Sequence, residues 1–112
     1  MSNTPPPNTA LSELAEVLGE DNVRTLVRTF LRDFPASIHE LSNAVRKERH
    51  RAAHSMKSNS RLMGAMELSA RMAELEKRLE SSEGADVTPA DLAAINAEFE
   101  QVAGPLRAFV GA

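Results

Sequence analysis

The chain has 112 residues, of which 42% are hydrophobic, and its formal net charge at pH 7 is −3. This length suits a single domain with one compact core, and the absence of cysteine excludes disulfides, thiolate catalysis and cysteine-based zinc sites. The acidic balance, with neither tryptophan nor tyrosine, is not that of a nucleic-acid-binding domain, and no apolar stretch approaches the ~20 residues that a membrane span requires.

The N-terminal residues 1–8 are rich in proline and asparagine, which predicts a disordered tail ahead of a folded domain over residues 9–112. The tail lacks the charged start and apolar stretch of a signal peptide, so we expect a cytoplasmic protein. A short first helix is predicted over residues 9–18 and ends at Gly19, and Asp21 is the expected N-cap of the second helix.

The second predicted helix carries apolar residues at spacings of three and four in one unbroken phase. The members of this stripe are Val23, Val27, Phe30, Phe34, Ile38, Leu41 and Val45. Pro35 lies inside the run, where it removes a backbone hydrogen bond and costs ~3 kcal/mol unless the helix kinks. Because the apolar phase is the same on both sides of Pro35, we predict one kinked helix rather than two.

Three further helices complete the predicted fold. The third covers residues 48–63, and Gly64 is the residue expected to break it. The fourth follows with an apolar face that runs to Leu79. The fifth begins at Thr88-Pro89-Ala90-Asp91, where threonine suits the N-cap, proline the first turn and aspartate the helix dipole. Gly104-Pro105 is expected to bend or interrupt it. Amphipathic helices with short connections pack most simply as a bundle, so we predict an all-α protein: an antiparallel four-helix bundle with an additional short N-terminal helix.

The third helix has one polar face that its packing does not explain. At about 100° per residue, Ala52, Met56, Asn59 and Met63 fall together on the side expected to face the core. His54 lies opposite them, in the same sector as Lys57 and Arg61. We therefore predict an exposed histidine beside two cations. Neutral imidazole is a good nucleophile, and an ordinary histidine pKa of ~6.5 leaves much of the ring neutral at cytoplasmic pH. A nearby lysine could offset the charge of a phosphoryl group on the ring.

The residues around this histidine read AHSMKSNSRLMGA over positions 53–65. The string resembles the signature of histidine phosphotransfer (HPt) domains, which has an Ala-His pair, an apolar residue, a lysine, a small residue and then Gly-Ala at matching spacings. Met56 stands where leucine is commoner and Ser58 where glycine is frequent, and both changes are conservative. Residues 66–76 resemble the family's next helix, and helix count and spacing extend the likeness over residues 22–110.

The resemblance implies a phosphorelay intermediate without autonomous kinase activity. His54 would accept a phosphoryl group from a receiver-domain aspartate and pass it to another receiver, and Lys57 would help to hold that group. The predicted docking residues are Ser58, Arg61, His50 and Gly64. The expected partners are response-regulator receiver domains and a hybrid sensor histidine kinase. Mg²⁺ would come from the receiver, no intrinsic cofactor or metal site is expected, and we expect a monomer.

Four other interpretations stay open at this point. His54 could be an ordinary surface histidine, or it could pair with His50 at the i, i+4 spacing that can ligate zinc, although no carboxylate has an obvious claim to complete such a site. The basic residues from Arg46 to Arg51 could simply solvate a helix junction. The same face could also serve a helical adaptor that binds a response regulator or kinase without being phosphorylated.

Overall fold

The structure is a computed structural model and describes residues 4–111. Over this range it contains five helices and no strand, which confirms the predicted all-α class. The helices are α1 (Thr9–Leu18), α2 (Glu20–Asn43), α3 (Arg46–Leu62), α4 (Met66–Glu80) and α5 (Pro89–Val110).

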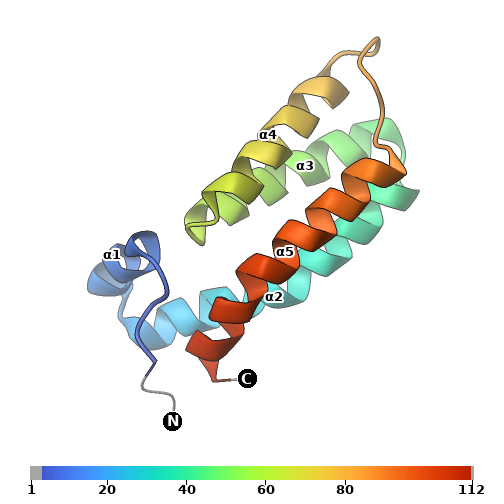
Figure 1. Cartoon of the computed structure of the whole chain (residues 1–112). Helices are drawn as coiled ribbons and strands as arrows, with labels where there is room; N and C mark the ends of the chain where they lie inside the picture. The colour runs from blue at the N-terminus through green and yellow to red at the C-terminus, as the bar shows by residue number, and fades with distance from the viewer. Residues whose placement is uncertain (1–3, 112) are drawn as a thin grey trace.

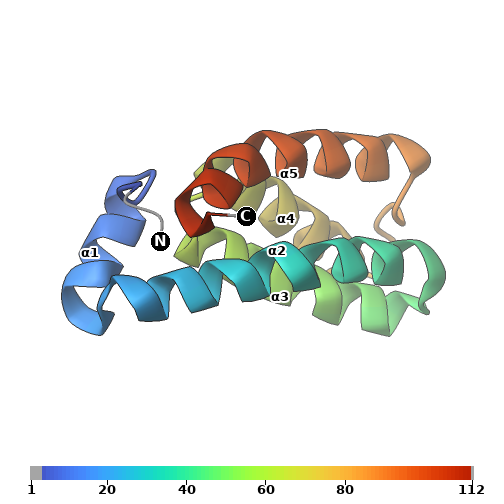
Figure 2. The ribbon, with the colours of Figure 1, turned by 90° about the horizontal axis from the view of Figure 1, so that it is seen from below.

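The four long helices pack side by side, and α1 lies at one end of them (Figures 1 and 2). Helix α2 packs against α3 and α5, and α4 packs against the same two helices, so the four form a closed ring of neighbours. Helix α1 packs mainly on α2. The connection from α4 to α5 lies at the end of the molecule opposite α1 (Figure 1).

The helix ends follow local capping chemistry. In α5 the Thr88 side chain accepts a hydrogen bond from the backbone of Asp91, whose carboxylate accepts one from the backbone of Thr88, so the predicted start is confirmed. Asn8 caps α1 and also donates to the carbonyl of Met63 at 2.9 Å. Asn8 therefore belongs to the folded part of the chain, one residue before the predicted boundary. Of the predicted disordered tail, residues 1–3 lie outside the described residues.

Two predictions at the ends of α2 are wrong. Asp21 is not the N-cap, because α2 begins immediately after Gly19, and Asp21 lies within its first turn. Val45 does not belong to the buried stripe and is 69% exposed, because α2 ends at Asn43 and the chain is extended at this residue before α3 begins. The third helix consequently starts two residues earlier than predicted, at Arg46.

Neither internal proline ends its helix. Pro35 lies inside the continuous α2, which confirms one helix rather than two. Pro105 lies inside α5, so Gly104-Pro105 does not interrupt that helix. Both prolines are exposed, which places the missing amide hydrogen bond on the solvent side, where water can satisfy the free carbonyl.

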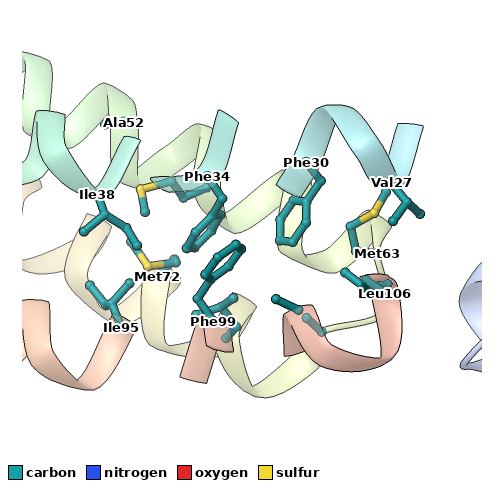
Figure 3. Close-up of a cluster of buried hydrophobic side chains, with 14 of the residues drawn as sticks. Val27, Phe30, Phe34, Ile38, Ala52, Met63, Met72, Ile95, Phe99 and Leu106 are labelled. Carbon is teal, nitrogen blue, oxygen red and sulfur yellow. The ribbon is translucent and has the colours of Figure 1, made fainter. Parts of the chain in front are cut away.

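The core runs along the axis of the four long helices (Figure 3). The ring of Phe34 from α2 stacks on Phe99 from α5, with centroids 4.8 Å apart, and Phe30 lies within 6 Å of both. Met56 and Met72 bring α3 and α4 into the same cluster, each almost fully buried. Burying each side chain of this size stabilises the fold by roughly 1.5–3 kcal/mol. This shared core fixes α3 against α4 and thereby positions the polar groups on their outer faces.

Candidate functional site

His54 lies in the middle of α3 and points away from the core. Its side chain is 59% exposed. The buried residues of the helix are Ala52, Ala53, Met56 and Ser60, with Met63 just after its end. The predicted exposure of His54 is thus confirmed. Asn59, by contrast, was expected to face the core and is exposed, because it lies at the edge of the buried sector.

A carboxylate from the neighbouring helix holds both His54 and Lys57. Glu76 of α4 contacts His54 Nδ1 through Oε2 at 2.5 Å and Lys57 Nζ through Oε1 at 2.5 Å. The Glu76 side chain is only 16% exposed, whereas Lys57 is about one third exposed. The buried Ser69 donates to the carbonyl of Lys57 at 3.0 Å and ties α4 to α3 at the same level. The side chains of His54, Lys57 and Glu76 therefore form one network across α3 and α4.

The electrostatics of this network assign the proton on the imidazole ring. The hydrogen bond from Lys57 and, to a lesser extent, that from His54 hold the pKa of the Glu76 carboxyl below its ordinary value, against the opposing effect of partial burial. An ionised carboxylate only accepts hydrogen bonds, so Nδ1 of His54 must be the donor. In the neutral ring, Nε2 then carries the free lone pair. No hydrogen bond to Nε2 is formed by any residue from 4 to 111.

This arrangement suits nucleophilic attack by Nε2. When the lone pair forms a new bond, the ring becomes a cation, and the Glu76 carboxylate is already placed at Nδ1 to stabilise it. Lys57 is one helical turn from His54, where its ammonium can also reach an anionic group on the ring. The site lies on a convex and accessible helix surface, so an in-line approach by a second protein is sterically possible.

Sequence reasoning missed Glu76, although a signal for it exists. His54 lies ten residues before Gly64 and Glu76 twelve residues after it. Since α3 and α4 are joined by a tight turn at Gly64, residues at similar distances from that turn face each other. An acid at this position is therefore well placed to contact the histidine.

The four predicted docking residues lie in two different places. Ser58 and Arg61 are exposed on the same side of α3 as His54, and His50 is half-buried one turn before it. Gly64 lies beyond the helix end with a φ of +78°, and a Cβ there would come within 2.6 Å of the Asn8 side-chain amide. Its position explains why glycine is needed for close packing at the α3–α4 turn. The docking roles themselves stay predictions.

Two arginines in the first turn of α3 have structural partners. Arg46 donates to the backbone carbonyls of Arg78, Ser81 and Gly84, and Arg49 forms an ion pair with Asp86 at 2.9 Å. These arginines anchor the α4–α5 connection rather than merely solvating a helix junction. Among residues 4–111, no group of three or more histidine, aspartate or glutamate side chains is arranged to hold a metal ion.

Comparison with known protein families decides the assignment. The family model of the Hpt domain matches residues 25–104, which includes His54, Lys57 and Glu76. The chain belongs to the Hpt domain family. Hpt domains are phosphotransfer modules of two-component phosphorelays and not kinases, and they interact with receiver domains and kinases.

Two further findings bear on this Hpt protein. No curated protein and no solved structure was found to be significantly similar to the chain. Within residues 4–111, none of the helices is long and apolar enough to cross a membrane. The family assignment therefore rests on the Hpt domain match together with the geometry around His54.

Proposed function

We propose that the protein is a phosphorelay intermediate that carries a phosphoryl group on Nε2 of His54. The observation that carries this proposal is the contact of Glu76 with Nδ1, which leaves Nε2 as the exposed nucleophile on an Hpt domain. We propose that an antiparallel four-helix bundle, with α1 as an additional short helix at one end, is the scaffold that holds this site.

The proposed transfer is a single displacement at phosphorus. The Nε2 lone pair of His54 attacks the phosphorus of an aspartyl phosphate on a receiver, an N–P bond forms, and the O–P bond to the aspartate breaks. The aspartate leaves as a carboxylate, and the proton on Nδ1 remains between the ring and Glu76. Transfer to a second receiver aspartate reverses these steps.

Charge compensation is divided between the two proteins. Receiver-bound Mg²⁺ would neutralise part of the charge on the equatorial oxygens of the transferring group. On this chain, Lys57 is the cation within reach, and Glu76 holds it in place before the phosphoryl group arrives. We expect Lys57 to turn from Glu76 toward the phosphoryl oxygens once the N–P bond has formed.

We further propose the cellular context that the sequence suggests. The protein would act as a cytoplasmic monomer, with response-regulator receiver domains and a hybrid sensor histidine kinase as partners. It would have no intrinsic cofactor and no kinase activity of its own, because the receiver supplies both the activated phosphoryl group and the metal ion.

The experiment is transfer of labelled phosphoryl groups from a panel of phosphorylated receiver domains with Mg²⁺, with His54→Gln as the comparison. We expect acid-labile, alkali-stable label on the wild type alone. If both forms bind a receiver equally but neither accepts label from any donor, the protein is a binding adaptor and the proposal is wrong.

A further inference from the structure

Two serines are buried in the helical bundle, and their hydroxyl groups are in different situations. Ser60 of α3 and Ser69 of α4 are the buried polar residues of the range 4–111. The hydroxyl of Ser69 donates to the backbone carbonyl of Lys57 at 3.0 Å, whereas the hydroxyl of Ser60 has no hydrogen-bond partner within this range. A buried hydroxyl costs stability unless it is hydrogen-bonded, so the same side chain has a different physical role at the two positions.

The hydrogen bond of Ser69 joins α4 to the backbone of a residue of the phosphotransfer site. A carbonyl oxygen has two lone pairs, and inside a helix one of them accepts from the amide four residues later. The Ser69 hydroxyl can therefore use the second lone pair of the Lys57 carbonyl. Because a serine side chain is short and its acceptor here is the helix backbone, this contact restricts how far α4 can slide along α3 (Figure 1).

Ser69 and Glu76 lie on the same face of α4. They are seven residues apart, which is almost two complete turns and ~10.5 Å along the helix axis. Ser69 contacts the backbone of Lys57, and Glu76 contacts the ammonium group of the same residue. Glu76 also contacts Nδ1 of His54. The position at which Ser69 holds α4 therefore determines which atoms of α3 the Glu76 carboxylate can reach.

The apolar contacts between α3 and α4 do not set this position as sharply. Met56 and Met72 contribute to the core from the two helices and are almost fully buried. Attraction between apolar side chains is non-directional, and methionine adapts to small shifts. Hydrogen bonds are directional and have donor–acceptor distances of about 2.7–3.2 Å, and a displacement of ~1 Å at a reactive site can cost up to ~100-fold in rate. The contact of Glu76 with Nδ1 thus depends on a directional link between the two helices, which Ser69 provides.

We propose that Ser69 is a positioning residue that acts on phosphotransfer through Glu76. This inference rests on the proposed phosphotransfer function. The hydrogen bond to the Lys57 carbonyl fixes the register of α4 along α3, and this register aligns Glu76 with Nδ1 of the histidine. Without the bond, Glu76 holds Nδ1 less firmly, and the neutral ring exchanges between the forms protonated on Nδ1 and on Nε2. The form protonated on Nε2 has no lone pair there with which to attack phosphorus.

The experiment compares Ser69→Ala with Ser60→Ala. Both substitutions remove the hydroxyl of a buried serine, but only the first removes a hydrogen bond. NMR of the unphosphorylated, ¹⁵N-histidine-labelled proteins, at a pH where the ring is neutral, reports which nitrogen of His54 carries the proton. Rapid-quench measurement of label transfer from a phosphorylated receiver at saturating concentration gives the rate, and circular dichroism shows that each variant is folded.

We expect Ser69→Ala to slow transfer by about three- to tenfold, the range that corresponds to loss of one neutral hydrogen bond. Part of its neutral His54 ring should also shift to the form protonated on Nε2. Ser60→Ala should transfer within about twofold of the wild type and keep the proton on Nδ1, because no hydrogen bond is lost.

Three results would overturn the proposal. A Ser69→Ala protein with the wild-type protonation of His54 would do so even if its transfer were slower, because Ser69 would then not act through Glu76. A wild-type transfer rate in Ser69→Ala, or the same changes in Ser60→Ala, would do so as well. Failure of the proposed function is distinguishable, because it appears as a wild-type protein that accepts label from no receiver. The NMR comparison needs no phosphorylation, and a proton shift in Ser69→Ala alone would still support the alignment of Glu76 by Ser69.

Discussion

The substitution Glu76→Gln isolates the role that the structure gives to the carboxylate beside His54. The change keeps the size of the side chain but removes its negative charge. Glu76 now accepts hydrogen bonds from both His54 Nδ1 and Lys57 Nζ. An amide offers one accepting oxygen, so one of these two donors loses its partner. Even if the remaining oxygen still accepts from Nδ1, the imidazole loses the negative charge that stabilises its cationic form.

The size of the effect follows from the charge that develops on the ring during transfer. Two unit charges about 4 Å apart interact by roughly 4 kcal/mol at an effective dielectric constant of 20, and water around the exposed histidine reduces this value. A hydrogen bond to a charged group contributes about 1.5–3 kcal/mol. We therefore expect receiver-to-His54 transfer to slow by roughly ten- to hundredfold, which corresponds to a barrier about 1.4–2.8 kcal/mol higher.

Rapid-quench measurement of label transfer from a phosphorylated receiver, at saturating receiver concentration, tests this value. Glu74→Gln is the matched control, because Glu74 is an exposed residue of the same helix two positions away. The control should transfer within about twofold of the wild type. If Glu76→Gln, folded as judged by circular dichroism, transfers as fast as the wild type, our reasoning about the carboxylate is wrong.

Further predictions concern stability. Gly64→Ala should lower the free energy of unfolding by about 1–3 kcal/mol in a urea titration, because φ is +78° there and the new methyl group would meet the Asn8 amide. Gly104→Ala is the control and should raise the free energy of unfolding by roughly 0.5–1 kcal/mol, because Gly104 lies in an open helical position. Equal effects of the two substitutions would contradict this account. Asp91→Asn should cost about 1–3 kcal/mol, since its carboxylate binds Arg78 at 2.6 and 3.0 Å. The hydrogen bond from Arg78 holds the pKa of Asp91 far below the ordinary value of ~3.9, so this stabilisation is present above about pH 4 and is lost as pH falls below it. A gap between the wild type and Asp91→Asn that is as large at pH 2 as at pH 7 would refute the ion-pair explanation.

Much of the fold could be predicted because the apolar periodicity is strong and the helix boundaries are chemically marked. The Thr88-Pro89-Ala90-Asp91 start of α5 is a local signal, and the structure confirms it. The exposure of His54 likewise follows from the phase of one helix. Val45 was misplaced because periodicity does not reveal where a helix ends, and a residue just past the last turn keeps the right spacing while leaving the buried face.

The carboxylate of the site could not be found in the same way, because it depends on how two helices pack. Glu76 lies 22 residues after His54 in the sequence, and only the antiparallel packing of α3 and α4 brings the two together. The Asn8 contact is another case, since it joins residues 55 positions apart. Such pairs depend on tertiary geometry rather than on local spacing, which is why the histidine was predicted and its partner was not.

The most direct test of the central claim is NMR of the ¹⁵N-histidine-labelled protein after phosphorylation by a receiver domain. We predict that phosphorus is bonded to Nε2 of His54 and that Nδ1 remains protonated, as its contact with Glu76 requires. Phosphorus bonded to Nδ1, or to a histidine other than His54, would contradict the account.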